Sequence, residues 1–344
     1  MTTAEGIIAA GFKIHGEEHD EGGIDPKQYH ESLHLDTVVH HMEKILIAID
    51  VSSKDQYLTL IAIAWHDKVL SYQHASSGEL LEQISRFRGA RASDLPSGSE
   101  GSEAQSARAV AQHMRDANKQ VEIFTEDDIR VVTLAIEFTF PEFKLAKFAD
   151  YPYYAQALEN NPKLIAAIGE MREGGTRDEL YITQPHFDEA LEAENKIPRP
   201  ALIMAVADLA TSGMESASDF FNEGDAECRE LHENLRDPKR LETISEIECI
   251  KVKNMLLNWL DGQPGFVAWQ ALRFEKLMYR LNEKNELSQS EIDKMRLHFC
   301  QFENNIRASM VRAQSMRETV ENFVSQQGEK AALISLMKTM GFTV

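Results

Sequence analysis

The sequence predicts a mostly or wholly α-helical protein. Apolar residues recur at three- and four-residue spacing through most of the chain, and the alternating runs typical of β-strands are scarce. Hydrophobic residues make up 43% of the 344 residues and charged residues 27%, which is ordinary for a globular protein with a sizeable core. At roughly 150 residues per domain, this length allows two domains or one domain with large additions.

Local signals mark where individual helices begin. Thr125 and Asp128 have the spacing of a capping box, in which each side chain satisfies a free backbone N–H at a helix start. Pro198 and Pro200 precede the apolar run 201–210, and proline suits the first turn of a helix because its missing N–H costs nothing there. We therefore expect helices after both pairs.

The chain after about residue 235 differs in character. Apolar residues follow a helical period over 241–260 and 267–279, and a longer, more polar helical stretch covers 291–324. We expect an additional C-terminal helical region over residues 236–344. Its helices either pack as an extension of the fold or form a surface for a partner or for homo-oligomerisation.

Charge and composition exclude several classes of protein. The chain has 36 Lys and Arg against 56 Asp and Glu, a net charge of −20, which argues against a nucleic-acid polymer as partner because phosphate neutralisation needs a basic surface. No apolar run approaches the roughly 18–20 residues that span a bilayer, so we expect no membrane partner. The N-terminus has no basic region ahead of its apolar stretch, and the three cysteines form no CxxC motif. We expect a cytoplasmic location.

A His-Asp pair at the end of an apolar segment is the first sign of a functional site. His66 and Asp67 follow residues 58–65, LTLIAIAW, which are almost wholly apolar. An imidazole and a carboxylate in such a setting cost free energy unless they are paired or bind a cation. Asp208 is similarly placed, as a single carboxylate in the run 201–214.

A second histidine shares these features. His34 lies near one helical face with Val38 and Met42, so its ring can point toward the interior. Taken singly, each of these residues has a plain explanation, such as a hydrogen-bonded core histidine or an ion pair between packed helices. Together they form a mixed nitrogen and oxygen donor set that suits a divalent ion such as Mn, Fe, Co, Ni or Mg better than a structural zinc. The predicted ligands are His34, His66, Asp67 and Asp208.

The order of these residues resembles the HD-domain superfamily of metal-dependent phosphohydrolases, whose pattern is His, then His-Asp, then Asp on a helical bundle. More narrowly, the sequence is similar to a bacterial subgroup of predicted HD phosphohydrolases. The subgroup's motifs match residues 29–34 (Tyr-His-x-x-x-His), 58–67 (an apolar helix ending in His-Asp), 102–107 (Asn-Glu-x-x-Ser-Ala, here with Ser in place of Asn) and 208–210 (Asp-Leu-Ala). The first motif makes His34 the first ligand, and the resemblance covers roughly residues 25–235.

The resemblance implies an HD-type helical bundle and hydrolysis of a small anionic phosphate ester, most simply a nucleotide. A bound ion would lower the pKa of a coordinated water and polarise a phosphoryl oxygen. The expected organisation is a flexible N-terminal segment (1–24), an HD-like metal-binding domain (25–235) and the C-terminal extension (236–344).

Three residues are candidates for the chemistry itself. Asp67 stays ionised beside the cation and can orient the attacking water, as can Asp208. Glu103 is a candidate acid or base, and its alternative is a solvated loop glutamate. Lys68 can meet the substrate phosphate as a point charge, or it can simply serve the helix dipole.

The candidates for substrate binding are His30, Arg86, Arg88 and Glu142. The two arginines belong to a basic cluster that can attract an anion, although a solvated helix face is the alternative. Glu142 stands where the subgroup usually has a histidine, which puts activity in doubt. His15 and His19 have i, i+4 spacing, but their Gly- and Glu-rich surroundings are typical of a disordered segment, so we do not expect them to bind metal.

Two other functions remain open at this point. One is oxygen chemistry at a paired iron site, which some HD-fold proteins perform and which needs more than four ligands. The other is a catalytically degenerate scaffold that binds a nucleotide or a protein through its C-terminal helices, and the glutamate at position 142 favours it.

Overall fold

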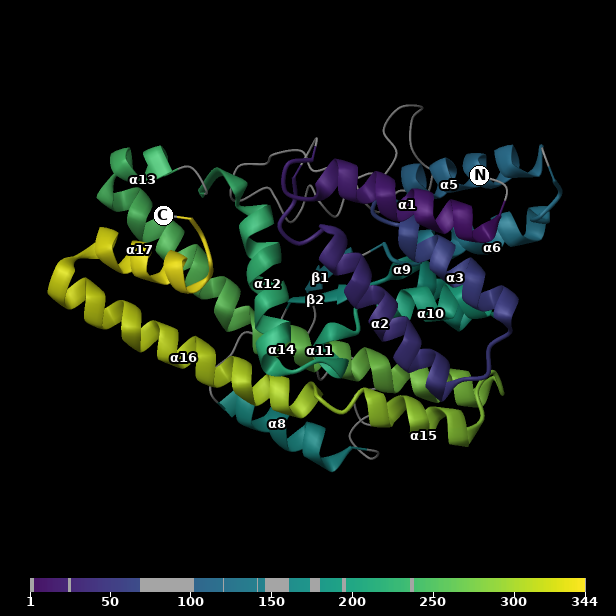
Figure 1. The fold of residues 1–344 in the computed structure, drawn as a ribbon. Helices are drawn as coiled ribbons and strands as arrows, with labels where there is room; N and C mark the ends of the chain where they lie inside the picture. The colour runs from purple at the N-terminus through teal and green to yellow at the C-terminus, as the bar shows by residue number, and fades with distance from the viewer. Residues whose placement is uncertain are drawn as a thin grey trace. The chain divides into compact units, whose positions relative to one another are not determined.

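The computed structural model describes residues 3–23, 26–68, 102–119, 121–140, 142–145, 161–173, 180–193, 196–235 and 238–343. Within these ranges the protein is helical apart from one short two-stranded sheet, which confirms the predicted all-α class (Figure 1). No described helix is both long enough and apolar enough to cross a membrane. The elements are α1 (Ala4–His19), α2 (Ser32–Ala48), α3 (Ser53–Trp65), α5 (Ser102–Asn118), α6 (Glu126–Glu137), β1 (Glu142–Leu145), α8 (Pro162–Glu173), β2 (Leu180–Thr183), α9 (Pro185–Glu192), α10 (Arg199–Ala207), α11 (Thr211–Met214), α12 (Ala217–Leu231), η2 (Glu233–Leu235), α13 (Pro238–Thr243), α14 (Glu246–Glu283), α15 (Gln289–His298), α16 (Phe302–Gln327) and α17 (Glu329–Thr339).

The chain divides into two compact units, each drawn from segments that are not consecutive. Unit 1 comprises Met1–Lys144, Ile182–Ala210 and Lys276–Phe299, and unit 2 comprises Leu145–Tyr181, Thr211–Glu275 and Cys300–Val344. Both the predicted 25–235 domain and the predicted C-terminal extension therefore contribute residues to both units. The division into consecutive domains stays a prediction.

Helix α3 lies at the centre of unit 1. Its second half is apolar on every side, and residues 61–65 are at most 1% exposed. Helices α1, α2, α5, α6 and α10 all pack against it. A helix without a polar face is stable only when it is surrounded by other elements, so the composition of α3 requires this arrangement. The His-Asp pair follows directly at its C-terminal end.

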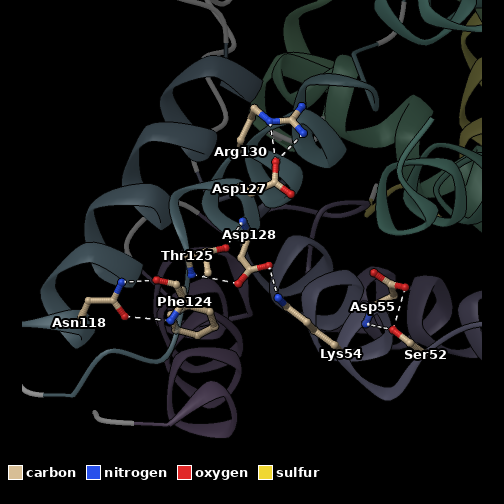
Figure 2. A network of polar contacts seen from close by, with 9 residues as sticks. All are labelled: Ser52, Lys54, Asp55, Asn118, Phe124, Thr125, Asp127, Asp128 and Arg130. Carbon is tan, nitrogen blue, oxygen red and sulfur yellow. Dashed lines mark hydrogen bonds and ion pairs between the residues drawn. The ribbon is translucent and has the colours of Figure 1, made fainter. Parts of the chain in front are cut away.

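The start of α6 forms the predicted capping box. The Thr125 hydroxyl accepts from the Asp128 N–H, and the Asp128 carboxylate accepts from the Thr125 N–H. Figure 2 shows that the same carboxylate also forms an ion pair with Lys54 of α3, with 2.7 Å between Nζ and Oδ1. Asn118 at the end of α5 hydrogen-bonds the backbone carbonyl and N–H of Phe124. This polar network joins α3, α5 and α6 near the surface of unit 1.

The predicted start of α10 is also confirmed. Pro198 is its N-cap and Pro200 lies in its first turn, and every side chain from residue 200 to 207 is buried. His41 of α2 donates from Nδ1 to the Ala207 carbonyl at 2.9 Å. This hydrogen bond fixes α2 against the C-terminal end of α10.

The N-terminal segment differs from expectation, because residues 4–19 form α1 rather than a flexible segment. Ile7, Gly11 and His15 recur every four residues and form a buried face, while the Gly and Glu residues that suggested disorder lie mostly on the other sides. Trp65 of α3 donates from its indole N–H to the Ile7 carbonyl at 3.1 Å. Packing against α3 therefore supplies the stability that the local composition lacks.

Helix α1 packs closely against α3 at Gly11. A Cβ atom at this position would lie 2.6 Å from the Ala64 carbonyl oxygen and 2.7 Å from Nε1 of Trp65, so α1 would have to move away. We expect Gly11→Ala to lower the free energy of unfolding by about 1–3 kcal/mol, as for other overpacked contacts. Chemical denaturation measures this change in the free energy of unfolding.

Gly169 in α8 is the matched control for this substitution, because a Cβ there meets no atom of the described part of the chain within 4 Å. Gly169→Ala should be neutral or stabilising by up to about 1 kcal/mol, since alanine is the better helix former. Equal stability of the two variants would show that α1 does not pack against α3 in this way.

Unit 2 has its own apolar core, built by the first part of α14 together with α16 and α17. Leu256 and Leu260 pack in one cluster with Leu333 and Leu336, all at most 1% exposed. The predicted helical stretches 241–260 and 267–279 correspond largely to the single helix α14, which continues through Pro264.

The predicted stretch 291–324 is instead divided into α15 and α16. Phe299 ends α15 with a non-helical ψ of 49°, and the chain passes there from unit 1 to unit 2. The apolar pattern keeps its helical period across so short an interruption, so the sequence does not reveal the break between the two helices.

A largely buried ion pair joins α12 to α16 within unit 2. Nη2 of Arg312 lies 2.5 Å from Oδ2 of Asp225, and the two side chains are 12% and 10% exposed. The guanidinium also donates to Gln263 of α14 and lies 4.6 Å from the ring centre of Phe221. One arginine thereby ties three helices of unit 2 together.

Candidate metal centre

Three helices of unit 1 bring the four predicted ligands together. His34 lies in the first turn of α2, His66 is the C-cap of α3, with Asp67 directly after it, and Asp208 is the C-cap of α10. These three helices pack against one another in pairs. The apolar sequences of α3 and α10 therefore place both acids where a buried helix ends.

The side chains converge on a small volume. Nε2 of His66 lies 2.8 Å from Oδ2 of Asp67 and 3.4 Å from Oδ1 of Asp208. Nε2 of His34 lies 3.4 Å from Oδ2 of Asp67 and 3.7 Å from Oδ1 of Asp208. One donor atom each from His34, His66 and Asp67 lies within 4.8 Å of the others, which is close enough to share an ion.

A hydrogen bond to the backbone fixes the orientation of the His66 ring. Its Nδ1 donates to the Ile63 carbonyl at 2.8 Å, so Nε2 is the nitrogen that faces the carboxylates. A ring held in this way by a backbone carbonyl is the usual support of a metal-binding histidine. The imidazole is 2% exposed and cannot turn toward solvent without disturbing the end of α3.

The charges of the cluster shift its pKa values strongly. Burial alone would lower the pKa of His66, but the Asp67 charge and hydrogen bonds to Asp208 and Asp67 outweigh burial and raise it well above 6.5. Burial alone would raise the pKa of Asp67, but His66, His30 and His34 lower it well below 3.8. The pKa of Asp208 is lowered in the same way, with hydrogen bonds to His34 and His66 outweighing burial.

The cluster is therefore electrostatically suited to bind a cation. Two carboxylates are kept ionised, and the C-terminal ends of α3 and α10, which carry the negative ends of their helix dipoles, lie at His66 and Asp208. Two imidazole nitrogens and two carboxylates form a donor set that fits a divalent transition metal or Mg²⁺. In the absence of an ion, the proton on His66 supplies part of the compensating charge.

His15 of α1 is a member of this neighbourhood that the sequence reasoning did not select. The ring is 1% exposed, and burial lowers its pKa to about 3, against the opposing charge of Asp67. His66, His34 and His19 also act on it electrostatically. The usable signal was the recurrence of Ile7, Gly11 and His15 at four-residue spacing, which places the ring on an apolar face.

Three other predicted residues lie in unit 1 with varied surroundings. Glu103 is buried in the first turn of α5, which packs against α3, so it is not a solvated loop glutamate. Nζ of Lys68 lies 3.6 Å from Oε1 of Glu18. His30 is buried, with its ring centre 5.7 Å from that of His34, and Tyr29 lies 4.6 Å from both rings.

The remaining predicted substrate-binding residues are not placed. Arg86 and Arg88 lie outside the described residues. The backbone of Glu142 begins β1, which pairs with β2, but its side chain also lies outside the described part of the structure. Their roles stay predictions.

Comparison with protein-family models, with curated proteins and with solved structures finds no match to this chain. The resemblance to the HD-domain superfamily therefore depends on the four sequence motifs alone. The convergence of the side chains is an independent observation, because it depends on the fold and not on the motifs.

Proposed function

We propose that this protein is a metal-dependent phosphohydrolase that cleaves a small phosphate ester, most simply a nucleotide. The observation that carries the proposal is the convergence of His34, His66, Asp67 and Asp208 at the ends of two buried helices, in a cluster arranged for a cation. The HD-like order of these residues in the sequence supports the same conclusion.

The distances within the cluster support a proposed role for each of the four residues. His34 and His66 bind a divalent ion through Nε2, and Asp67 and Asp208 bind and balance its charge. When bound, such an ion lowers the pKa of a coordinated water and polarises a phosphoryl oxygen. The carboxylates can also accept a hydrogen bond from the attacking water and orient it, because both stay ionised at neutral pH.

The groups around the centre are proposed to serve the substrate. Lys68 interacts with the phosphate, Glu103 exchanges a proton, and His30 lines the pocket. Arg86, Arg88 and Glu142 complete the proposed substrate-binding set. Homo-oligomerisation through the C-terminal helices and a cytoplasmic location stay predictions.

Hydrolysis is tested with full-length protein loaded in turn with Mn²⁺, Fe²⁺, Co²⁺, Ni²⁺ or Mg²⁺ and supplied with nucleotides and generic phosphate esters. We expect release of inorganic phosphate with at least one ion, and none after chelation. Stoichiometric metal without phosphate release from any ester would contradict the hydrolase proposal and favour a binding scaffold. Oxygen uptake by the iron-loaded protein would favour iron–oxygen chemistry instead.

The pKa of His66 predicts how metal binding depends on pH. Because this pKa is raised well above 6.5 in the metal-free protein, His66 carries a proton at pH 7, whereas a metal-binding imidazole must be neutral. Binding should therefore release a proton, and the apparent affinity should rise by about tenfold per pH unit until the pH passes that pKa. Calorimetry in two buffers of different ionisation enthalpy measures the release.

The stability of the metal-free protein depends on pH in the opposite direction to the metal affinity: it falls as the pH rises. A raised pKa contributes stability that is fully present below the unfolded-state value of 6.5 and is lost as the pH rises through the folded-state pKa. A binding enthalpy that does not depend on the buffer would show that His66 is already neutral.

A further inference from the structure

His15 has a property that the metal centre does not explain. The side chain is 1% exposed, and neither Nδ1 nor Nε2 has a hydrogen-bond partner among the residues that the structure describes. Buried polar groups in folded proteins are almost always hydrogen-bonded, because leaving one unpaired costs free energy. An imidazole with two unsatisfied nitrogens next to a candidate active site indicates a partner that binds there.

The contacts of α1 place this imidazole beside the His-Asp pair. Gly11, one turn earlier in α1, is the point of close approach to Ala64. Glu18, about one turn later, has its carboxylate 3.6 Å from Nζ of Lys68. His15 lies between Gly11 and Glu18 on α1, so it faces the segment between Ala64 and Lys68, which contains the His-Asp pair. Asp67, His66 and His34 all act on it electrostatically.

His15 nonetheless does not belong to the ligand set itself. Among the described residues, His34, His66 and Asp67 have donor atoms within 4.8 Å of one another, and Asp208 adds a carboxylate oxygen 3.4 Å from Nε2 of His66. His15 belongs to neither contact and forms no hydrogen bond with these four side chains. Within the described residues, no backbone carbonyl accepts a hydrogen bond from His15, whereas the Ile63 carbonyl accepts one from His66. A metal-binding histidine usually has such support, so the ring is better suited to a ligand next to the ion.

We propose that His15 is a substrate-binding residue whose imidazole N–H donates a hydrogen bond to a phosphoryl oxygen of the substrate. The inference rests on the proposed hydrolase function and names one group that recognises its phosphate. A neutral imidazole always has one N–H, so a donor is available in either tautomer. A phosphate next to Asp67 and Asp208 needs such donors, because these carboxylates repel it.

The test uses inorganic phosphate and the Mn²⁺-loaded full-length protein. Binding is measured by calorimetry for the wild type, for His15→Leu, which removes both nitrogens, and for His15→Gln, which keeps a donor. We expect equal Mn content in all three, phosphate affinity about tenfold or more lower in His15→Leu, and a smaller loss in His15→Gln. The thermal midpoint of His15→Leu should equal or exceed the wild-type value, since an unpaired buried group has been removed.

The matched control is His232→Gln. His232 lies at the end of α12 in unit 2, where burial is the cause that lowers its pKa, so the variant should leave Mn content and phosphate binding unchanged.

Four outcomes would overturn the inference. Loss of Mn from His15→Leu would make His15 a ligand, and unchanged phosphate affinity would exclude a substrate contact while leaving the hydrolase proposal intact. A wild type that binds Mn²⁺ but no phosphate, or no Mn²⁺ at all, would remove the proposed function together with the inference.

Discussion

Asp67→Asn should abolish stoichiometric binding of a divalent ion and with it any release of phosphate. Asparagine has the shape of aspartate, so packing at the end of α3 is preserved while one of the two negative charges is lost. The Asp67 carboxylate lies 2.8 Å from His66 and 3.4 Å from His34, so it approaches both imidazoles more closely than Asp208 does. The loss in affinity should exceed the roughly 10–100-fold that removal of an outer partner of a metal site costs.

Elemental analysis after dialysis measures this effect, and His66→Ala should behave in the same way. Asp127→Asn is the matched control, because Asp127 is an exposed acid of unit 1 that pairs with Arg130 and lies outside the cluster (Figure 2). Full metal content and full activity in Asp67→Asn would place the site elsewhere in the protein.

Arg312→Met should destabilise unit 2 by about 3–5 kcal/mol, the usual cost of leaving one member of a buried ion pair behind. Burial already raises the pKa of Asp225 above its ordinary value, although the Arg312 charge opposes this shift. Without Arg312, the carboxylate would lose its ion-pair partner and keep only the weaker effect of the Arg229 charge. Denaturation followed by tryptophan fluorescence reports the change, because Trp259 and Trp269 belong to unit 2; the third tryptophan, Trp65, belongs to unit 1.

Two further variants show whether the cost comes from the unpaired charge. Asp225→Asn combined with Arg312→Met should recover much of the lost stability, because no charge is left uncompensated. Arg307→Met removes an exposed pair with Glu170 and should change stability little. If Arg312→Met and Arg307→Met were equally stable, the Asp225–Arg312 pair would contribute no more than an exposed one.

Much of unit 1 could be predicted because its sequence signals are local. The apolar run before His66 requires a surrounded helix, and the Thr125–Asp128 pair forms a capping box wherever a helix begins. The candidate ligands were found for the same reason, since a carboxylate such as Asp208 in an apolar run needs a compensating cation. Each candidate was first selected from a residue and its immediate neighbours, and the order of the four along the chain then joined them into one set.

The rest depends on contacts between segments that are distant in the sequence. His15 was set aside because its local composition suggests disorder, and only the close approach of Gly11 to Ala64 makes it part of a buried face. The break between α15 and α16 at Phe299 coincides with the chain's passage from unit 1 to unit 2. The four-residue spacing of Ile7, Gly11 and His15 is the local sign of the first feature, whereas the second leaves no pattern within a single helix.

The most direct test of the central claim is anomalous diffraction, at the manganese edge, from crystals of the full-length protein grown with Mn²⁺. The proposal predicts one strong peak in contact with His34, His66, Asp67 and Asp208. A map with no peak among these four side chains, or with its strongest peak bound elsewhere on the protein, would contradict it.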